Sequence, residues 1–246
     1  MLSDEQLLTY SRQIMLPQID IDGQQKLVDS HLVILGLGGL GSPVAMYLAT
    51  SGIANITLID DDKVELSNLQ RQIIHKASSQ GQEKVLSAKA NLLSLNPELR
   101  INTINHRLNE DALSDVIKGA DAVADCCDNF ATRFMLNRQC HQHNVPLISG
   151  AAIRWEGQLT TFMMDQNSPC YRCLYDEDSF TDETCAQNGV VGPVVGIIGS
   201  MQALEVIKVI TGAGKPAVGQ LTLFDGLENR FSQIKYNRKA NCPVCG

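Results

Sequence analysis

The segment from Ser30 to Asp62 constrains the fold most, because it predicts a strand, a glycine-rich turn, a helix and a second strand in that order. Leu32–Leu35 is short and apolar with β-branched residues, as is typical of a strand buried on both faces of a parallel sheet. After it, the spacing G-x-G-x-x-G is formed by Gly36, Gly38 and Gly41. Helical periodicity follows at once, so the order matches a unit that binds a nucleotide.

The second apolar run, Ile56–Ile59, ends at Asp60, at the position about twenty residues beyond the glycines where such units have the acid that binds a ribose hydroxyl. Glycine lets the backbone turn sharply and lets a phosphate approach the amide groups at a helix N-terminus. We therefore predict a nucleotide site here. The fingerprint fits ATP and NAD equally, and a turn that serves packing alone is the other interpretation.

Composition narrows the class of protein. A chain of 246 residues with 44% hydrophobic and 19% charged residues fits one soluble domain over residues 1–246. The net charge of −7 and the pI near 5.2 argue against a general binder of nucleic acid or of acidic membranes. Neither a signal pattern nor an apolar run of membrane-spanning length is evident, so we expect a cytoplasmic protein without a membrane segment.

The rest of the chain continues an alternation of strands and helices. Strands are expected at 100–105, 120–125 and 145–150, and helices at 4–14, 81–95, 111–117 and 130–141. Beyond residue 151 the pattern becomes hairpin-like, except for a loop at 176–188 and a helix that ends at Ile210. We predict a Rossmann-like, doubly wound α/β sheet, parallel in a nucleotide-binding half (1–150) and mixed or antiparallel in the remaining half (151–246).

Several polar residues fall near the expected site. Asn68 and Arg71 share a face of any helical turn, and Lys84 opens a helix at the end where acids are preferred, which suits a phosphate as well as solvent. Asp128 follows a buried strand, where ligands of open α/β sheets bind, although it could instead be a helix cap. Arg12, in the N-terminal arm, suits a solvated surface on residue type alone.

Cysteine spacing predicts a metal site. Two C-x-x-C pairs, Cys170 with Cys173 and Cys242 with Cys245, supply four thiolates with no open position, which is the ligand set of structural Zn²⁺. The alternative is two unrelated thiol pairs or a redox dithiol. We expect the metal to fasten the C-terminal tail to the body of the domain.

Together these motifs resemble the ThiF/MoeB/HesA family, the bacterial relatives of the ubiquitin-activating enzymes. The matching segments are YSRQI at 10–14, GLGGLG at 36–41, LSNLQRQ at 66–72, DCCDN at 125–129, CYRC at 170–173 and CPVC at 242–245. Some of the remaining segments, such as residues 60–62, look more like the ThiF branch, and others, such as 149–154, more like the MoeB branch. The resemblance therefore leaves the branch open.

The resemblance implies that ATP reacts with the C-terminal Gly-Gly carboxylate of a small ubiquitin-fold sulfur carrier protein, giving an acyl-adenylate and pyrophosphate. It implies the following roles: phosphate contacts for Gly38, Gly39 and Gly41, nucleotide contacts for Asp60 (the ribose) and Asp62, triphosphate contacts for Asn68, Arg71 and Lys84, and Mg²⁺ binding for Asp128. In a homodimer, Arg12 would reach the site of the other subunit.

The resemblance also implies partners. A separate sulfur donor, such as a cysteine desulfurase, would deliver sulfur for thiamin or molybdopterin synthesis. Cys185 matches a cysteine of the relatives that takes part in sulfur transfer in one branch, although no neighbouring cation is evident to generate a thiolate. Two other functions stay open: an NAD-dependent oxidoreductase, and a zinc-stapled binding protein without catalysis.

Overall fold

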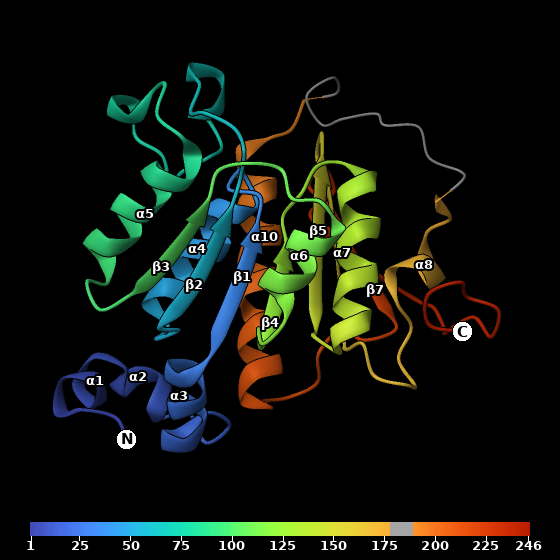
Figure 1. Cartoon of the computed structure of the whole chain (residues 1–246), viewed down its shortest axis with the longest axis horizontal. Coiled ribbons are helices and arrows are strands. Elements are labelled where there is room, and N and C mark those ends of the chain that lie inside the picture. Colours follow the sequence, from blue (N-terminus) through green and yellow to red (C-terminus); the bar gives the residue numbers. More distant parts are fainter. Residues whose placement is uncertain (178–188) are drawn as a thin grey trace.

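The chain folds around one mixed sheet. In the computed structural model, which describes residues 1–177 and 189–246, eight strands form a sheet of order β3-β2-β1-β4-β5-β6-β7-β8 (Figure 1). The strands are β1 (His31–Leu35), β2 (Asn55–Ile59), β3 (Arg100–Ile104), β4 (Ala122–Asp125), β5 (Leu147–Ile153), β6 (Glu156–Phe162), β7 (Gln220–Asp225) and β8 (Arg230–Lys235). Pairing is parallel from β3 to β5 and antiparallel from β5 to β8, which confirms the predicted change of sheet type.

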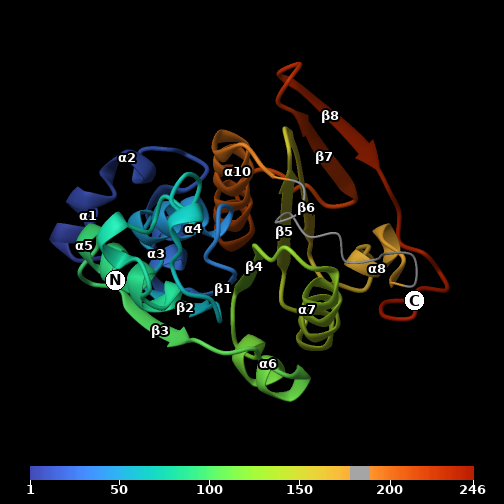
Figure 2. The ribbon, with the colours of Figure 1, turned by 90° about the horizontal axis from the view of Figure 1, so that it is seen from above.

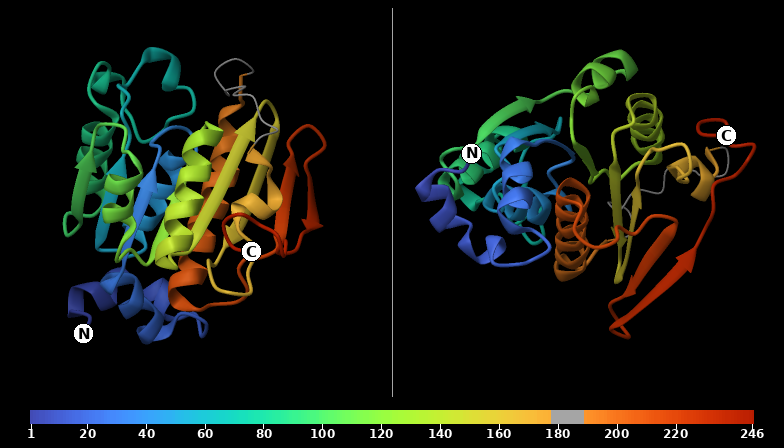
Figure 3. Two further views of the ribbon diagram at one scale, coloured as in Figure 1. Left: turned by 45° about the vertical axis from the view of Figure 1, so that its right-hand side comes forward. Right: turned by 90° about the horizontal axis from the view of Figure 1, so that it is seen from below.

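Helices cover both faces of the sheet (Figure 2). One face packs against α4 (Gly41–Thr50), α5 (Lys84–Leu95) and α10 (Gly192–Thr211), and the other against α6 (Glu110–Ile117) and α7 (Phe130–His143). The shorter helices are α1 (Asp4–Thr9), α2 (Ser11–Ile14), α3 (Asp20–Asp29), α8 (Tyr171–Leu174) and the 3₁₀ turns η1 (Leu66–Asn68) and η2 (Ala77–Ser79). The hairpin β7–β8 lies at one end of the sheet, and the C-terminal segment lies beside α8 (Figure 3).

The position of the central strand β1 explains its continuous apolar sequence. Leu32 and Ile34 belong to the core on the α4 side, whereas Val33 belongs to the core on the α7 side, and all three are fully buried. Because successive side chains of a strand point to opposite faces, a strand covered on both faces is apolar without alternation. The predicted buried strand is therefore confirmed.

The N-terminal arm differs from the single helix that we expected over residues 4–14. It is divided at Tyr10 into α1 and α2, and a further helix, α3, follows that the sequence pattern did not predict. Gln13 and Gln24 both hydrogen-bond the carbonyl oxygen of Ser51, at 3.0 and 2.9 Å, and so hold the arm against the end of α4. Gly23, inside α3, allows close approach to α10, which is a tertiary effect that local propensity does not show.

Helix α10 corrects one expectation. We expected no apolar run of membrane-spanning length, yet α10 has 20 residues and is apolar enough to cross a membrane by length and composition. It begins at Gly192, with Pro193 in its first turn, and packs against α4, β5 and β6. The amide Nε2 of Gln202 donates to the carbonyl oxygen of Asp125 at 2.8 Å in the middle of the domain, so α10 is a core helix.

Candidate functional site

A cavity opens at the carboxyl ends of β1 and β4, where the strand order reverses. Its volume of about 360 Å³ falls within the roughly 300–1,000 Å³ of small-molecule sites. Its walls come from the glycine turn, the segment after β2, the first turns of α5 and α7, strands β5–β7 and the start of α10. This is the switch point at which open α/β sheets bind ligands, and five of the predicted site residues line it, among them Gly38, Gly39, Arg71 and Lys84. Asp128 lines it as well.

The glycine turn is packed so closely that side chains are excluded at most of its glycines. A Cβ on Gly41 would lie 1.9 Å from the carbonyl oxygen of Gly36, and one on Gly36 would lie 2.6 Å from the carbonyl oxygen of Cys126. Gly36 also has φ of +93°, a conformation that favours glycine. At Gly39 a Cβ would approach Val195 of α10 to 2.8 Å. At Gly38 it would meet only Gln72, at an ordinary 3.6 Å.

Two side chains clamp the turn at Leu37. Its backbone N–H donates to Asp60 Oδ2 at 2.7 Å, and its carbonyl oxygen lies 3.0 Å from His75 Nε2. Since a carbonyl only accepts, Nε2 of His75 is the protonated nitrogen, and Nδ1 accepts from the Ser87 hydroxyl at 2.9 Å. Burial lowers the pKa of His75, which favours this neutral form.

Asp60 lies beside the turn rather than in the wall of the cavity. Its second oxygen accepts the backbone N–H of Asp62 at 2.9 Å. Burial raises its pKa above the ordinary value, while Lys84 and the two N–H donors act in the opposite direction. Each carboxylate oxygen still has a second lone pair for a ligand hydroxyl.

Lys84 is a buried cation in the wall of the cavity. Its side chain is 6% exposed, and its Nζ lies 2.8 Å from Oδ2 of Asp62, whose side chain is 65% exposed. An exposed carboxylate can rotate away, so the ammonium is available to a phosphate oxygen. Arg71 Nη1 donates to the carbonyl oxygen of Ser67 at 3.1 Å, and Asn68 closes η1 by accepting the N–H of Glu65 at 3.1 Å.

The loop after β4 shows which residue caps α7. The N-cap of α7 is Asn129, whose Oδ1 accepts the N–H of Thr132 at 2.9 Å. The interpretation of Asp128 as a helix cap is therefore wrong, and Asp128 lines the cavity. A carboxylate at this position fits the preference of Mg²⁺ for oxygen ligands. Gln72, another lining residue, has a buried Oε1 without a hydrogen-bond partner among the described residues, which leaves an acceptor for a ligand donor.

Sequence reasoning missed Arg133 of α7, a buried guanidinium in the cavity wall. It pairs with Asp125 Oδ2 at 3.1 Å and donates to Ser149 Oγ at 3.0 Å. Burial acts to lower its pKa, but the Asp125 carboxylate and other neighbours raise it above its ordinary value. No local pattern singles out this residue, because its partners lie on β4 and β5.

The far end of the cavity is lined by residues of the antiparallel strands and α8, which sequence reasoning also missed: Glu156, Gly157, Gln158, Tyr171 and Leu223. Among the described cysteines, Cys126 and Cys127 border the cavity. Burial raises the pKa of both thiols, so neither is an activated nucleophile. Cys185 lies outside the described residues.

Arg12 is separated from the cavity. It belongs to α2, which lies at the opposite end of the sheet from the carboxyl ends of the parallel strands (Figure 1). The cavity of the described chain has no contribution from α2. Within one subunit, therefore, Arg12 is not brought together with the other predicted residues.

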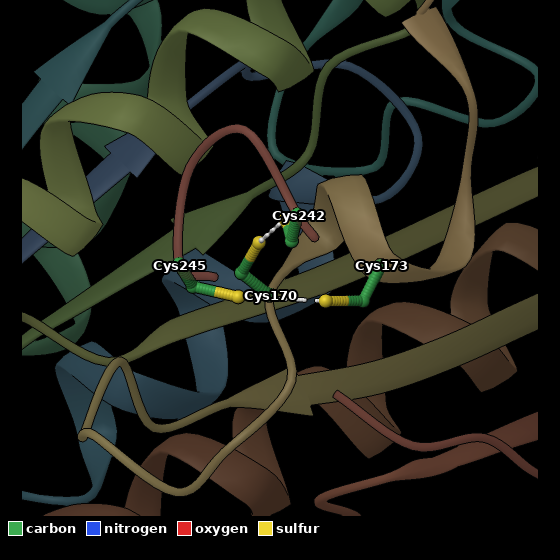
Figure 4. Close-up of side chains that lie close together, drawn as sticks. All are labelled: Cys170, Cys173, Cys242 and Cys245. Carbon is green, nitrogen blue, oxygen red and sulfur yellow. Dashed lines mark hydrogen bonds between the residues drawn. The ribbon is translucent and has the colours of Figure 1, made fainter. Parts of the chain in front are cut away.

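The four cysteines of the two C-x-x-C pairs come together, with side chains that point toward one another (Figure 4). All four sulfur atoms lie within 4.8 Å of one another, Cys170 and Cys242 at 3.6 Å and Cys173 and Cys245 at 3.4 Å. These separations are too long for disulfides, which need about 2.05 Å. They are close to the roughly 3.8 Å between thiolates on a tetrahedral ion with bonds of about 2.3 Å. The donor set fits Zn²⁺.

Polar groups surround this four-cysteine cluster, by which we mean Cys170, Cys173, Cys242 and Cys245. The backbone N–H of Lys239 donates to Cys173 Sγ at 3.4 Å, and Asn137 Nδ2 donates to Cys170 Sγ at 3.7 Å. Such donors stabilise thiolates and orient them toward an ion.

Comparisons with known proteins agree with this geometry. The ThiF family model matches residues 10–244. The chain is 46% identical to molybdopterin-synthase adenylyltransferase of Escherichia coli (strain K12), covering 100% of this chain and 98% of that protein. It is 44% identical to sulfur carrier protein ThiS adenylyltransferase of the same organism, covering 100% and 97%. The crystal structure of E. coli MccB with ATP aligns with a TM-score of 0.81 and 27% identity, over 92% of this chain and 70% of that one.

Proposed function

Because this chain belongs to the ThiF family, we propose that it is an ATP-dependent adenylyltransferase that activates the C-terminal Gly-Gly carboxylate of a small ubiquitin-fold sulfur carrier protein. The carboxylate attacks the α-phosphorus of ATP, and the products are an acyl-adenylate and pyrophosphate. The observation that supports this most is the cavity in which Lys84 and Arg71 lie with the glycine turn and Asp128. An oxidoreductase would leave this set of charges unexplained.

The reaction joins an anion to a polyanion, so its main requirement is positive charge. Backbone amides of the glycine turn, from Gly38 to Gly41, would bind phosphate oxygens at the N-terminus of α4. Lys84 and Arg71 would neutralise the triphosphate and the departing pyrophosphate, with Asn68 holding the segment before Arg71 in place. Asp60 would accept a ribose hydroxyl. Asp62 would release Lys84 when phosphate binds.

Asp128 is the residue that would hold Mg²⁺, which supplies charge neutralisation at the phosphates when it is bound. The attacking carboxylate is already ionised near neutral pH, since such groups have pKa values of about 3.5. The residues of the site therefore need only to position the two substrates and to neutralise their negative charge, and no general base is required.

The two halves of the chain would bind the two substrates at opposite ends of the cavity. Residues 1–150 provide the nucleotide end of the cavity, and residues 151–246 the end that would receive the carrier tail, lined by Gln158, Tyr171 and Leu223. Arg12 lies too far away to act within its own subunit, so we propose a homodimer in which it reaches the partner's site. Cys185 would act after adenylation, in sulfur transfer.

We assign a structural Zn²⁺ to the four-cysteine cluster, where the closed set of thiolates has no position for a substrate. Sulfur would come from a separate donor such as a cysteine desulfurase. Buried free thiols such as Cys126 and Cys140 suit a reducing compartment, which supports a cytoplasmic protein. The similar identities to the two adenylyltransferases leave both a ThiS-like and a MoaD-like carrier as candidates.

Carrier-dependent ATP–pyrophosphate exchange tests the proposal. We expect exchange with a ThiS-like or a MoaD-like carrier and none with a carrier that lacks its last glycine. Asp128→Ala should abolish exchange while the circular dichroism spectrum and the zinc content stay unchanged. Asp115→Ala, which removes an exposed carboxylate of α6, is the matched control and should be active. Absence of exchange with every Gly-Gly carrier would contradict the proposed function, and full exchange by Asp128→Ala would contradict the role of that residue.

A further inference from the structure

Arg133 has no role in the mechanism above, although it is a buried cation in the wall of the cavity. Its side chain is 6% exposed, near the start of α7. A charge in such a position either binds the ligand or holds the protein around it. The contacts of its guanidinium decide between these two roles.

Both terminal nitrogens of Arg133 are occupied by protein acceptors. Nη1 donates to Asp125 Oδ2 at 3.1 Å and to Ser149 Oγ at 3.0 Å, while Nη2 donates to the carbonyl oxygens of Gly150, at 2.8 Å, and of Cys127. Each terminal nitrogen has two N–H groups, so these four contacts use all of them. These two terminal nitrogens, which we call the Arg133 fork, join the ends of β4 and β5. They leave no terminal N–H group for a phosphate.

The contact with Cys127 bears directly on Asp128. The carbonyl group of Cys127 and the N–H of Asp128 belong to one planar peptide unit, so a bond that fixes the carbonyl also fixes the orientation of the next residue. The N–H of Cys127 is held as well, by Asp125 Oδ1 at 3.1 Å. Asp125 and Arg133 thus hold the backbone of Cys127 from both sides.

Tyr171 connects this fork to the four-cysteine cluster. It lies between Cys170 and Cys173 in the sequence, is 1% exposed, and lines the cavity together with Arg133, whose guanidinium is a charged neighbour of the Tyr171 side chain. Its ring packs edge-on against Phe134 at 5.2 Å and against Phe162 at 5.8 Å. These ring contacts hold Tyr171 in the wall of the cavity, and its place in the C-x-x-C segment joins that wall to the four-cysteine cluster.

We propose that Arg133 is a positioning residue that orients Asp128 for the metal–nucleotide complex, and that Tyr171 supports Arg133 from the four-cysteine cluster. The inference rests on the proposed function, because Asp128 is there the ligand of Mg²⁺. The four-cysteine cluster would then have two roles: it fastens the C-terminal tail, and it supports the wall of the cavity through Tyr171. Loss of the fork should loosen the Asp128 loop and leave the Lys84 side of the cavity intact.

The test compares Arg133→Lys with Arg138→Lys, which changes a half-buried arginine of the same helix that pairs with Glu110 and Glu177 outside the cavity. Lysine keeps the charge opposite Asp125 but lacks the fork. Hydrogen–deuterium exchange of the ligand-free protein should rise at 126–130 and 149–151 in Arg133→Lys and stay unchanged at 36–41. By calorimetry, ATP affinity in EDTA should match the wild type, whereas the gain in affinity on adding Mg²⁺ should fall about 10- to 100-fold, the typical cost of losing a group that orients a metal ligand.

A second pair of variants tests the inference in case Arg133→Lys does not fold. Tyr171→Phe keeps the ring and removes the hydroxyl, and Tyr236→Phe does the same for a tyrosine of the same aromatic cluster that does not line the cavity. We expect faster exchange at 126–130 and a weaker Mg²⁺ effect for Tyr171→Phe alone.

Three outcomes would overturn the inference. The first is wild-type exchange and Mg²⁺ dependence in folded Arg133→Lys. The second is an equal loss of ATP affinity in EDTA, which would make Arg133 a direct nucleotide contact. The third is identical behaviour of the two tyrosine variants, which would remove the role of Tyr171. If the wild type fails in ATP–pyrophosphate exchange with every carrier, the proposed function fails, while hydrogen–deuterium exchange still decides whether Arg133 holds the loop.

Discussion

Replacing Gly41 with alanine tests whether the glycine turn is fixed by its own packing. The new Cβ would lie 1.9 Å from the carbonyl oxygen of Gly36 and 3.6 Å from Cys126 Cβ. The first of these is a contact with backbone, so no side chain can rotate away to relieve it. Either the buried start of α4 or the end of β1, where Leu35 is half-buried, must move by more than an ångström.

The expected cost follows from that displacement. Overpacking of a well-packed core costs about 1–3 kcal/mol when side chains can adjust, and here the backbone itself must move. We therefore expect a loss of about 3 kcal/mol or more in the free energy of unfolding, which for a chain of this size lowers the melting temperature by roughly 6–12 °C.

Gly196→Ala is the matched control, since it makes the same change inside a helix. A Cβ at Gly196 meets nothing within 4 Å, and the residue is a part of α10. Alanine at an unstrained helical position is expected to add about 0.5–1 kcal/mol, because it reduces the conformational freedom of the unfolded chain. Thermal unfolding followed by circular dichroism measures both variants. A melting temperature of Gly41→Ala equal to that of the wild type would show that the turn has room for a side chain and would refute this reasoning.

Three further changes test other parts of the site. Cys242→Ser should lower both the zinc content and the melting temperature, because one ligand of a closed site is lost; unchanged values in both would exclude the metal. The pKa of buried His75 lies below 6.5 in the folded state, so the unfolded chain takes up its proton first and stability should fall as the pH drops below about 6.5. His75→Gln should reduce that acid-side loss in melting curves recorded from pH 8 to 5, and an unchanged pH dependence would contradict it. Gly38→Ala should melt like the wild type but bind ATP more weakly in calorimetry, and undiminished binding would show that the nucleotide does not approach Gly38.

The order of strands and helices was predictable where packing imposes a simple pattern. Strands covered on both faces are mostly apolar, and β1, β2 and β4 follow this pattern apart from single polar residues such as Thr57 and Asp125. Helix α3 was missed because it contains Gly23 and many polar residues, and its position depends on contacts with Ser51 and with α10. Local patterns contain no information on such contacts.

The site was predictable to the extent that its residues follow one another in a known unit. Lys84 and Asp128 stand at element ends, which is why their position was informative. Arg133 gave no such signal: an arginine inside a helix with many polar residues suggests a surface position, and only the fold places it against Asp125 and Ser149. The choice of cap between Asp128 and Asn129 likewise needed the structure, since both residue types cap helices well.

The glycines of the G-x-G-x-x-G spacing fall, in the structure, into two that packing requires and one that packing does not require. A Cβ on Gly41 would meet the backbone of Gly36, and a Cβ on Gly36 would meet the backbone of Cys126, so this protein would need both glycines even without a nucleotide. Gly38 has room for a methyl group beside Gln72, yet it borders the cavity. A glycine that the fold does not demand is explained by a group that must approach the backbone closely. The spacing therefore predicts a nucleotide only through its middle glycine, and its outer glycines predict the turn.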